Sequence, residues 1–413
     1  MSLLDYRTRN VIEDRHFPAP DGTFPIGLDI GYSGVKAVSP NKAFCFPSYA
    51  RRIENGYVSL KDPDPCDIIY RDNEIGTYLV GDLAYKDVIG SEVMDSEYEL
   101  YGRKRYDSDI FHVLARTGIA LALLPNQYGD ARDKKTFKKI FVQSGLPTKY
   151  STDGDALLRA ISEMPEFEIK VGARPYIKSS DLFNGISFLP PMKQPMGALM
   201  TACFIPSLGE WVADDKVITG PDGRPQLVPG AATLFKKNVL VVDPGFGTTD
   251  TFAVNIGSVN QNTSETFSEL GMRAVYEKTC AKIRQLYGED IQVYELYNYL
   301  SRGYISVPDQ NSKKRFARKN IDFSSIIDEC SLEVCENLID KLAKSNNNFR
   351  ETDIIIGSSG GFDAWGDIFK EALSGIEGLI ILPANHRDKT LSLIMSIAYG
   401  YFANAARQAG KSV

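Results

Sequence analysis

The 413-residue sequence predicts an α/β protein with two lobes. Apolar, strand-like runs alternate with helical segments along the chain, a pattern typical of α/β folds. One further pattern appears once in each half, at residues 29–36 and 243–250: an apolar strand ends at an aspartate, turns through glycines and continues as a second strand. This repetition indicates that each half builds a lobe around the same kind of hairpin.

The composition is that of a globular protein, with 43% hydrophobic and 24% charged residues. A net charge of −6 argues against a protein that coats nucleic acid, because that task needs a basic face, so we expect no direct nucleic-acid contact. The six cysteines and three histidines lack zinc-ligand spacing and predict reduced thiols. No secretory signal is evident, and the most apolar stretch, Gly118–Pro125, is far shorter than the ~20 residues of a membrane span. We therefore expect a cytoplasmic protein without membrane contact.

The first half opens with a polar lead-in, residues 1–24, which the Asp21-Gly22 turn closes. Ser108 is placed to cap a helix from Asp109 to Leu124, and Pro125 ends it. The other elements predicted in this half are strands at 26–30, 35–38, 140–143, 167–171 and 186–189, a hairpin within 67–80, and a helix at 155–164.

The second half is predicted to hold strands at 239–242 and 354–356 and helices at 196–205, 272–287, 323–345, 364–373 and 389–408. A loop-rich stretch, residues 206–230, interrupts this pattern. We expect lobe I to span residues 25–192, with a small subdomain at about 40–105, and to be completed by the C-terminal helix, 389–413. Lobe II is expected at residues 193–388, with a small subdomain at about 272–348.

The two glycine turns share one chemical design. The first is Asp29-Ile30-Gly31-Tyr32-Ser33-Gly34-Val35-Lys36, and the second is Asp243-Pro244-Gly245-Phe246-Gly247-Thr248-Thr249-Asp250. Glycines let the backbone turn several N–H groups toward one anion, and the serine and threonine hydroxyls add donors. Lys36 adds a positive charge for a terminal phosphate. Asp29 and Asp243 are expected to hold Mg²⁺ through its water shell.

Each turn taken alone could be an ordinary β-turn, but two of the same design favour a pair of phosphate-binding hairpins. Their strand–turn–strand context excludes a P-loop, which needs Gly-x4-Gly-Lys-Ser/Thr before a helix. The second turn also fails the Gly-x-Gly-x-x-Gly fingerprint of dinucleotide-binding folds, because Asp250 stands at its last position.

A third glycine-rich turn follows the strand at 354–356 and precedes the helix predicted at 364–373. It consists of Gly357, Ser358, Ser359, Gly360, Gly361 and Phe362. Small residues there could let a flat purine ring lie against the backbone. The alternative is a plain loop between a strand and a helix.

In this order, the three motifs resemble the actin-like ATPase superfamily over residues 25–407. Within it, the chain looks closest to the ParM-like plasmid-segregation actins. Shorter pieces carry this closer resemblance: Phe46-Pro47-Ser48, Tyr78–Ala84, Ser144–Pro147, Leu270-Gly271-Met272, and the terminal helix after Asn385–Lys389.

The resemblance implies an actin-like ATPase fold, in which each lobe has a mixed sheet flanked by helices and ATP or GTP lies with Mg²⁺ in the cleft between lobes. The matched positions of the two phosphate loops are Asp29, Gly31, Tyr32, Ser33, Gly34, Lys36, Asp243, Gly245, Phe246, Gly247, Thr248, Thr249 and Asp250. Those that would flank the ribose and base are Gly271, Met272 and the six residues of the third turn, Gly357–Phe362.

The family orients its attacking water with a Glu or Gln just before the interlobe helix. Gln194, in Gln194-Pro195-Met196, fits that position, and a neutral amide can perform this role in phosphoryl transfer. A surface glutamine at a helix start is the alternative. Asp243 is the second catalytic candidate, through its metal ion.

The resemblance implies a polymerising nucleotide hydrolase whose head-to-tail filaments assemble on ATP or GTP binding and disassemble after hydrolysis. Such filaments segregate plasmid DNA through a DNA-binding adaptor protein. Two alternatives stay open: a small-molecule kinase of the same superfamily, for which Asp250 is the candidate base, and a cytoskeletal or scaffold ATPase without a segregation role. The basic cluster at residues 313–319 is either a solvated face or a contact for the filament or adaptor.

Overall fold

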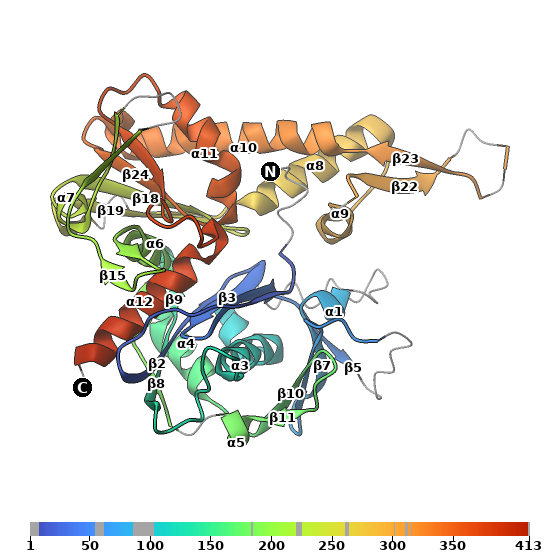
Figure 1. The fold of residues 1–413 in the computed structure, drawn as a ribbon. Coiled ribbons are helices and arrows are strands. Elements are labelled where there is room, and N and C mark those ends of the chain that lie inside the picture. Colours follow the sequence, from blue (N-terminus) through green and yellow to red (C-terminus); the bar gives the residue numbers. More distant parts are fainter. Residues whose placement is uncertain are drawn as a thin grey trace.

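A computed structural model describes residues 8–53, 62–85, 103–182, 185–219, 225–260, 264–300, 302–309, 313–314 and 316–411. Figure 1 shows two lobes, each built on a sheet, with helices α6 (Gln194–Ala202) and α12 (Ser396–Lys411) between them. The predicted α/β class is confirmed.

The main sheet of lobe I runs in the order β1-β4-β3-β2-β8-β12. Its strands are β1 (Val11–Asp14), β2 (Gly22–Ile30), β3 (Gly34–Ser39), β4 (Lys42–Pro47), β8 (Phe137–Gln143) and β12 (Ile186–Phe188). Strands β2 and β3 form the first predicted hairpin, and β2 runs parallel to β8. Helices lie on both faces: Leu28 packs toward α3 (Asp109–Leu123), whereas a Cβ at Gly27 would collide with the backbone of α12. Strand β2 is therefore apolar on both faces.

A second sheet of lobe I runs in the order β11-β10-β6-β7-β5. Its strands are β5 (Ala50–Ile53), β6 (Ile68–Asp72), β7 (Gly76–Val80), β10 (Phe167–Val171) and β11 (Ile177–Lys178). The β6–β7 pair is the hairpin predicted within residues 67–80. The short helices of this lobe are α1 (Asp82–Tyr85), η2 (Arg103–Asp107), η3 (Thr148–Asp153), α4 (Gly154–Ser162) and α5 (Ser179–Leu182). Of these, α1 lies against β7, and α5 lies against β10 and β11.

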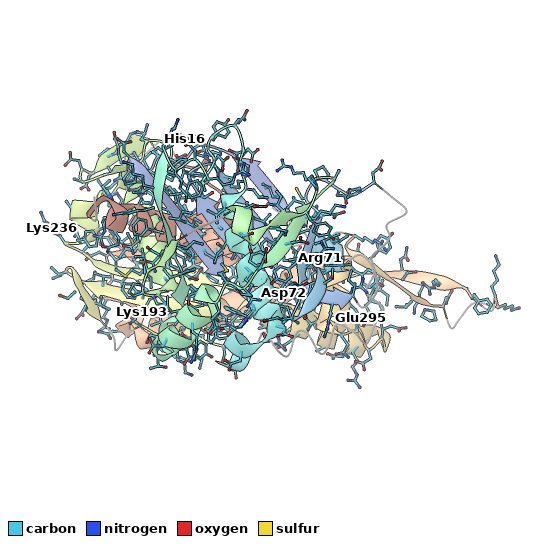
Figure 2. All side chains as sticks on the ribbon, turned by 90° about the horizontal axis from the view of Figure 1, so that it is seen from below. His16, Arg71, Asp72, Lys193, Lys236 and Glu295 are labelled. Atoms are coloured by element: carbon cyan, nitrogen blue, oxygen red, sulfur yellow. The ribbon has the colours of Figure 1, made fainter. Side chains whose placement is uncertain are left out.

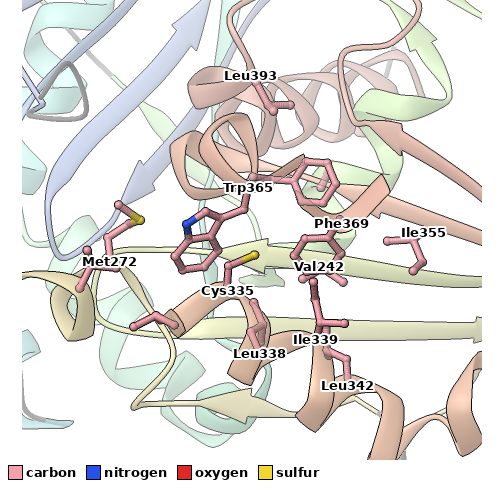
Figure 3. Packing of buried hydrophobic residues seen from close by; sticks show 14 of the residues in the cluster. Val242, Met272, Cys335, Leu338, Ile339, Leu342, Ile355, Trp365, Phe369 and Leu393 are labelled. Atoms are coloured by element: carbon pink, nitrogen blue, oxygen red, sulfur yellow. The ribbon is translucent and has the colours of Figure 1, made fainter. Parts of the chain in front are cut away.

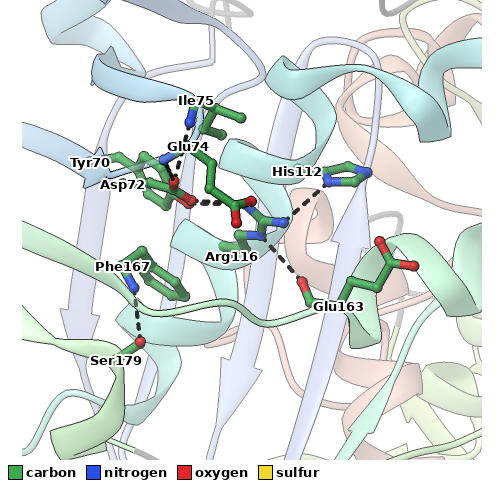
Figure 4. A network of polar contacts seen from close by, with 9 residues as sticks. All are labelled: Tyr70, Asp72, Glu74, Ile75, His112, Arg116, Glu163, Phe167 and Ser179. Carbon is green, nitrogen blue, oxygen red and sulfur yellow. Dashed lines mark hydrogen bonds and ion pairs between the residues drawn. The ribbon is translucent and has the colours of Figure 1, made fainter.

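A buried polar network ties this second sheet to α3 (Figure 4). Arg116 of α3 pairs with the Asp72 carboxylate of β6 at 3.2 Å and donates to the Tyr70 hydroxyl at the same distance. Its remaining donors reach the Glu163 carbonyl oxygen and the His112 ring. Each nitrogen of the guanidinium thus has a hydrogen-bond partner, which is what a buried charge requires.

Lobe II is built on the sheet β20-β19-β18-β24-β25, with β21 paired to β19. These strands are β18 (Asn238–Pro244), β19 (Thr249–Asn255), β20 (Ser258–Asn260), β21 (Thr266–Phe267), β24 (Ile354–Gly357) and β25 (Ile380–Pro383). The helices of this lobe are α8 (Met272–Tyr287), α9 (Val293–Tyr299), α10 (Ser324–Ser345) and α11 (Ser359–Ala372), with η5 (Asn347–Phe349). Figure 3 shows their core, where the buried Trp365 lies near Cys335 and Phe369, and the Trp365 indole donates to the Ser331 hydroxyl at 2.8 Å.

A hairpin of β22 (Tyr304–Pro308) and β23 (Arg318–Asp322) projects away from lobe II in both Figure 1 and Figure 2. The basic cluster noted at 313–319 falls on this hairpin, although Arg315 lies outside the described residues. Lys313, Lys314 and Phe316 are exposed, with Phe316 at 85%.

Several predicted elements need correction. Residues 8–24 are no separate lead-in, because β1 pairs with β4 and Phe17 is fully buried against α12. The C-terminal helix begins at Ser396 rather than 389, after the turn η6 (Leu393–Met395). The loop-rich stretch contains the pair β16 (Lys216–Thr219) and β17 (Pro225–Val228) and the short strand β15 (Glu210–Trp211). Strand β15 pairs with β14 (Phe204–Ile205) just before the stretch, and the short helix α7 (Ala231–Leu234) follows it. All six cysteines are unpaired, as expected.

The two lobes meet at the crossing of α6 and α12. Helix α12 lies against β2 of lobe I, and α6 lies against β18 of lobe II. The helices approach so closely that a Cβ at Gly400 would lie 1.9 Å from the Gly197 carbonyl oxygen. Another short pair, β9 (Gly145–Leu146) with β13 (Met192–Lys193), leads into α6.

Candidate functional site

The two hairpin turns face each other across the cleft, with the start of α6 at its base. A cavity of about 50 Å³ lies between them and takes its lining from both lobes. The lining residues are Asp29, Gly31, Tyr32, Ser33, Lys36, Arg105, Pro147, Gln194, Asp243, Gly245, Phe246, Thr248, Asp250, Ser359 and Ile397. Residues that lie more than 160 positions apart in the chain thus form one site.

The first turn, between β2 and β3, is held by Ser48, which lies just after the end of β4. The Gly31 N–H donates to the Gly34 carbonyl oxygen at 3.1 Å, which closes the turn. Ser48 clamps it from outside: its hydroxyl donates to the Gly31 carbonyl oxygen at 2.6 Å, and its N–H donates to the Ser33 carbonyl oxygen at 3.2 Å. The Phe46-Pro47-Ser48 motif thus positions the loop.

Asp29 is the centre of a charged group at the base of the cavity. One of its oxygens pairs with Lys36 Nζ at 3.2 Å, and the other accepts from Gln194 Nε2 at 3.1 Å. Burial acts to lower the pKa of Lys36, but the nearby Asp29 and Asp243 carboxylates outweigh burial and raise it. Lys36 therefore stays charged inside the cavity.

The second turn mirrors the first. The Gly245 N–H donates to the Thr248 carbonyl oxygen at 2.8 Å. Asp243, only 6% exposed, accepts from the Ser358 hydroxyl at 2.8 Å. Burial raises the pKa of Asp243, and the charge of Asp29 adds to that rise. The carboxylates of Asp29 and Asp243, which repel each other electrostatically, thus line the same cavity.

The second turn also caps helix α8. The N–H groups of Met272 and Arg273 donate to the Gly245 and Phe246 carbonyl oxygens at 3.0 and 2.9 Å, which satisfies free donors at the helix start. A Cβ at Gly271 would lie 2.6 Å from the Phe246 oxygen. Gly271 and Met272, predicted near the ribose, therefore brace the loop and do not line the cavity.

Asp250 links the two lobes. Its carboxylate accepts from the Thr248 hydroxyl at 2.9 Å, the Thr266 hydroxyl at 2.5 Å and, from lobe I, the Thr148 N–H at 3.1 Å. Burial, more than any nearby charge, raises the pKa of this carboxyl to about 6. A carboxylate with both oxygens engaged by protein donors is poorly placed to take a proton from a substrate hydroxyl, which argues against the kinase alternative.

The third glycine turn differs from the sequence expectation. Helix α11 begins at Ser359 instead of 364, so Ser359, Gly360 and Gly361 lie within its first turn. A Cβ at Gly361 would lie 2.2 Å from the Pro244 oxygen, and one at Gly357 would lie 2.0 Å from the Phe362 ring. These small residues allow β24, α11 and the second loop to pack tightly, and only Ser359 among them lines the cavity.

The structure brings most of the predicted phosphate-loop residues to one cavity, together with Gln194. The predicted residues outside its lining are Gly34, Gly247, Thr249, Gly271, Met272, Gly357, Ser358, Gly360, Gly361 and Phe362. Three residues of the lining were not among the predicted site residues: Arg105, Pro147 and Ile397. Pro147 belongs to a motif noted for resemblance alone, and Arg105 carried no sequence signal.

The donor set fits Mg²⁺. Within the described residues no cluster of three or more His, Cys, Asp or Glu side chains is suited to a metal ion. Mg²⁺ commonly uses one or two carboxylates and completes its shell with water and phosphate oxygens, which the Asp29 and Asp243 pair allows. A divalent cation there would also offset the electrostatic repulsion between the two buried carboxylates.

Two lobes on mixed sheets, two crossing helices between them and paired aspartate–glycine hairpins across the cleft define the actin-like fold. Residues 27–174 match a protein-family model described as the N-terminal domain of actin-like proteins. No curated protein sequence matches the chain. No helix among the described residues is long and apolar enough to cross a membrane.

Solved ParM structures share this fold along nearly the whole chain. A non-polymerisable quadruple mutant of pCBH ParM is 18% identical, with a TM-score of 0.63, over 95% of this chain and 100% of its own. A 15-stranded ParM filament from Clostridium botulinum is 17% identical, with a TM-score of 0.59, over 94% and 99%. Bacillus thuringiensis ParM with ADP is 15% identical, with a TM-score of 0.54, over 94% and 99%. The predicted resemblance to ParM-like actins is confirmed, as a likeness of fold.

Proposed function

We propose that this protein is a Mg²⁺-dependent nucleoside triphosphatase that uses ATP or GTP and assembles into filaments. The observation that carries this proposal is the shared cavity, where both glycine hairpins, Lys36, the two aspartates and Gln194 come together. Each is a group that phosphoryl transfer needs: loops for phosphates, a cation, metal-binding carboxylates and a residue that orients water.

The roles divide by chemistry. The hairpin N–H groups and the Ser33 hydroxyl hold phosphate oxygens, and Lys36 neutralises their charge. Asp29 and Asp243 hold Mg²⁺ through water, and the bound ion supplies charge neutralisation at the phosphates. Gln194 donates its amide to Asp29, which fixes the side chain and leaves its carbonyl oxygen to accept from an attacking water.

The nucleotide would act as a link between lobes. Asp250 and Gln194 already connect them through Thr148 and Asp29 on either side of the cavity. At about 50 Å³ the cavity is far smaller than the roughly 300 Å³ of typical ligand sites, so nucleotide entry requires the lobes to separate. Binding and hydrolysis would then control lobe closure. We place lobe I at residues 25–192, completed by the N-terminal segment that carries β1 and by the C-terminal helix, and lobe II at 193–388.

The likeness of fold to a ParM filament supports assembly of this chain into head-to-tail protofilaments that segregate plasmid DNA in the cytoplasm. The net charge of −6 supports an indirect link to DNA, through a DNA-binding adaptor protein. The projecting β22–β23 hairpin, with its exposed lysines and Phe316, offers a candidate contact surface for the filament or adaptor.

Light scattering of the purified protein with Mg²⁺ and either ATP or GTP, followed by electron microscopy and phosphate-release assays, tests this proposal. We expect scattering to rise with at least one nucleotide and to fall as phosphate is released. Asp243→Ala should slow phosphate release by at least ~10²-fold, whereas the surface variant Asp367→Asn should match the wild type. Absence of scattering with both nucleotides at micromolar protein would refute filament assembly, and unchanged release by Asp243→Ala would refute its catalytic role.

A further inference from the structure

Arg105 is a buried cation at the cavity. It lies in η2, just before α3, and its side chain is only 4% exposed while it lines the space between the two hairpins. Its backbone is fixed, because its carbonyl oxygen accepts from both the hydroxyl and the N–H of Ser108, the cap of α3. The Arg105 side chain therefore extends from a backbone position that is held rigidly just before α3.

Three aromatic rings hold the Arg105 guanidinium. Its central carbon lies 4.9 Å from the Tyr32 ring centre, 5.1 Å from Tyr106 and 5.4 Å from Phe111. The guanidinium carbon lies over these rings, whose π faces supply cation–π attraction but accept no in-plane hydrogen bonds. The planar fork is thus fixed in orientation while its N–H edge still needs acceptors.

Within the described part of the chain, the Arg105 guanidinium makes no hydrogen bond or ion pair with protein groups. The contrast with Arg116 is direct: that buried guanidinium has a carboxylate, a hydroxyl, a carbonyl oxygen and an imidazole as partners. A buried charged group without acceptors is costly unless a ligand or water supplies them. The cavity is the space that Arg105 adjoins, so an anion bound there would supply the missing acceptors.

Arg105 and Lys36 occupy different parts of the cavity lining. Lys36 is held by Asp29 at the base of the cleft. Arg105 stacks on Tyr32, whose ring in turn lies against the second hairpin, because a Cβ at Gly247 would be 2.7 Å from it. A phosphate chain bound between the two hairpins would thus contact Lys36 and Arg105 at different positions.

We propose that Arg105 binds the terminal phosphate of a nucleoside triphosphate held between the hairpins. This inference rests on the proposed function and adds a residue that distinguishes triphosphate from diphosphate. The guanidinium fork matches two phosphate oxygens at once, which a lysine cannot do. An arginine of this kind stabilises charge on the transferring phosphoryl group. It loses its phosphate partner when the terminal phosphate leaves after hydrolysis.

Calorimetric titration with AMPPNP and with ADP, both with Mg²⁺, tests the assignment. Arg105→Gln should weaken AMPPNP binding by roughly tenfold or more, since charge-assisted bonds to the terminal phosphate are lost. ADP binding should change by less than about twofold, which also shows that the variant is folded. Arg105→Lys should show a smaller loss that is still selective for AMPPNP. The control Arg132→Gln, at an exposed arginine paired with Asp130, should bind both nucleotides as the wild type does.

Equal weakening of AMPPNP and ADP by both Arg105 variants would overturn the terminal-phosphate assignment, and so would unchanged binding of both. These outcomes leave the proposed function standing, because the wild type still binds nucleotide. Failure of the wild type to bind either nucleotide would instead overturn the proposed function and this inference together.

Discussion

Replacing Asp250 by asparagine should change how the stability of the protein depends on pH. In the folded protein burial raises the pKa of Asp250 from an ordinary value of 3.8 to about 6. Burial thus favours the neutral form, so the stability associated with this group is fully present below pH 4 and is lost as pH rises through 6. A pKa difference of about two corresponds to about 3 kcal/mol, at about 1.4 kcal/mol for each tenfold change.

Asparagine is neutral at every pH and can keep the two bonds to one oxygen, from the Thr148 N–H and the Thr266 hydroxyl. The Thr248 hydroxyl can rotate to accept from the new amide. The free energy of unfolding of Asp250→Asn, minus that of the wild type, should therefore rise by about 2–3 kcal/mol between pH 4 and pH 7.5.

Urea unfolding of both proteins across this pH range measures the difference. Asp133→Asn is the matched control: hydrogen bonds, led by that from the Thr136 hydroxyl, lower the pKa of the exposed Asp133. The free energy of unfolding of Asp133→Asn, minus that of the wild type, should therefore fall as pH rises. A difference for Asp250→Asn that stays constant with pH would refute the argument that burial raises this pKa.

Three further predictions follow from packing and polar contacts. Gly400→Ala should cost about 1–3 kcal/mol or more in urea unfolding, because its Cβ would strike the α6 backbone, whereas Gly154→Ala, with open space around it, should be neutral or slightly stabilising; equal effects would contradict the tight crossing. Arg116→Met should cost about 3–5 kcal/mol in the same assay, since it leaves Asp72 buried without its cation; a loss below about 1 kcal/mol would refute a buried charge pair. Gln194→Ala should slow phosphate release at least about tenfold with nucleotide affinity retained; lost binding in a calorimetric titration would show that its role is misassigned.

Local sequence signals predicted the elements that carry the site. Ser108 and Pro125 bracket α3 as expected, because a capping hydroxyl and a proline act within one turn of the chain. Helix α8 has the predicted bounds, Met272–Tyr287, and ends at Gly288 in the left-handed region. The β2–β3 and β18–β19 hairpins were recognisable from strand–glycine–strand patterns alone.

Other features depend on contacts between distant segments and left no local signal. Strand β1 is an edge strand with mostly exposed side chains, so its sequence reads as a polar lead-in until β4 is present beside it. Ser359 starts α11 with a positive φ of 65°, which its hydroxyl bond to the Pro244 oxygen stabilises. Arg105 is set apart from other arginines only by the rings around it and by the cavity it adjoins, which the folded chain alone reveals.

The proposed function is tested most directly by whether nucleotide binding depends on the metal ion that Asp29 and Asp243 are proposed to hold. Calorimetric titration of the wild-type protein with AMPPNP, with Mg²⁺ and then with EDTA in its place, measures this dependence. We expect binding with Mg²⁺ and an affinity at least about tenfold weaker without it, because the buried carboxylates then repel the phosphates. Absence of binding, or an affinity unchanged by EDTA, would contradict a Mg²⁺–nucleotide site between the two hairpins.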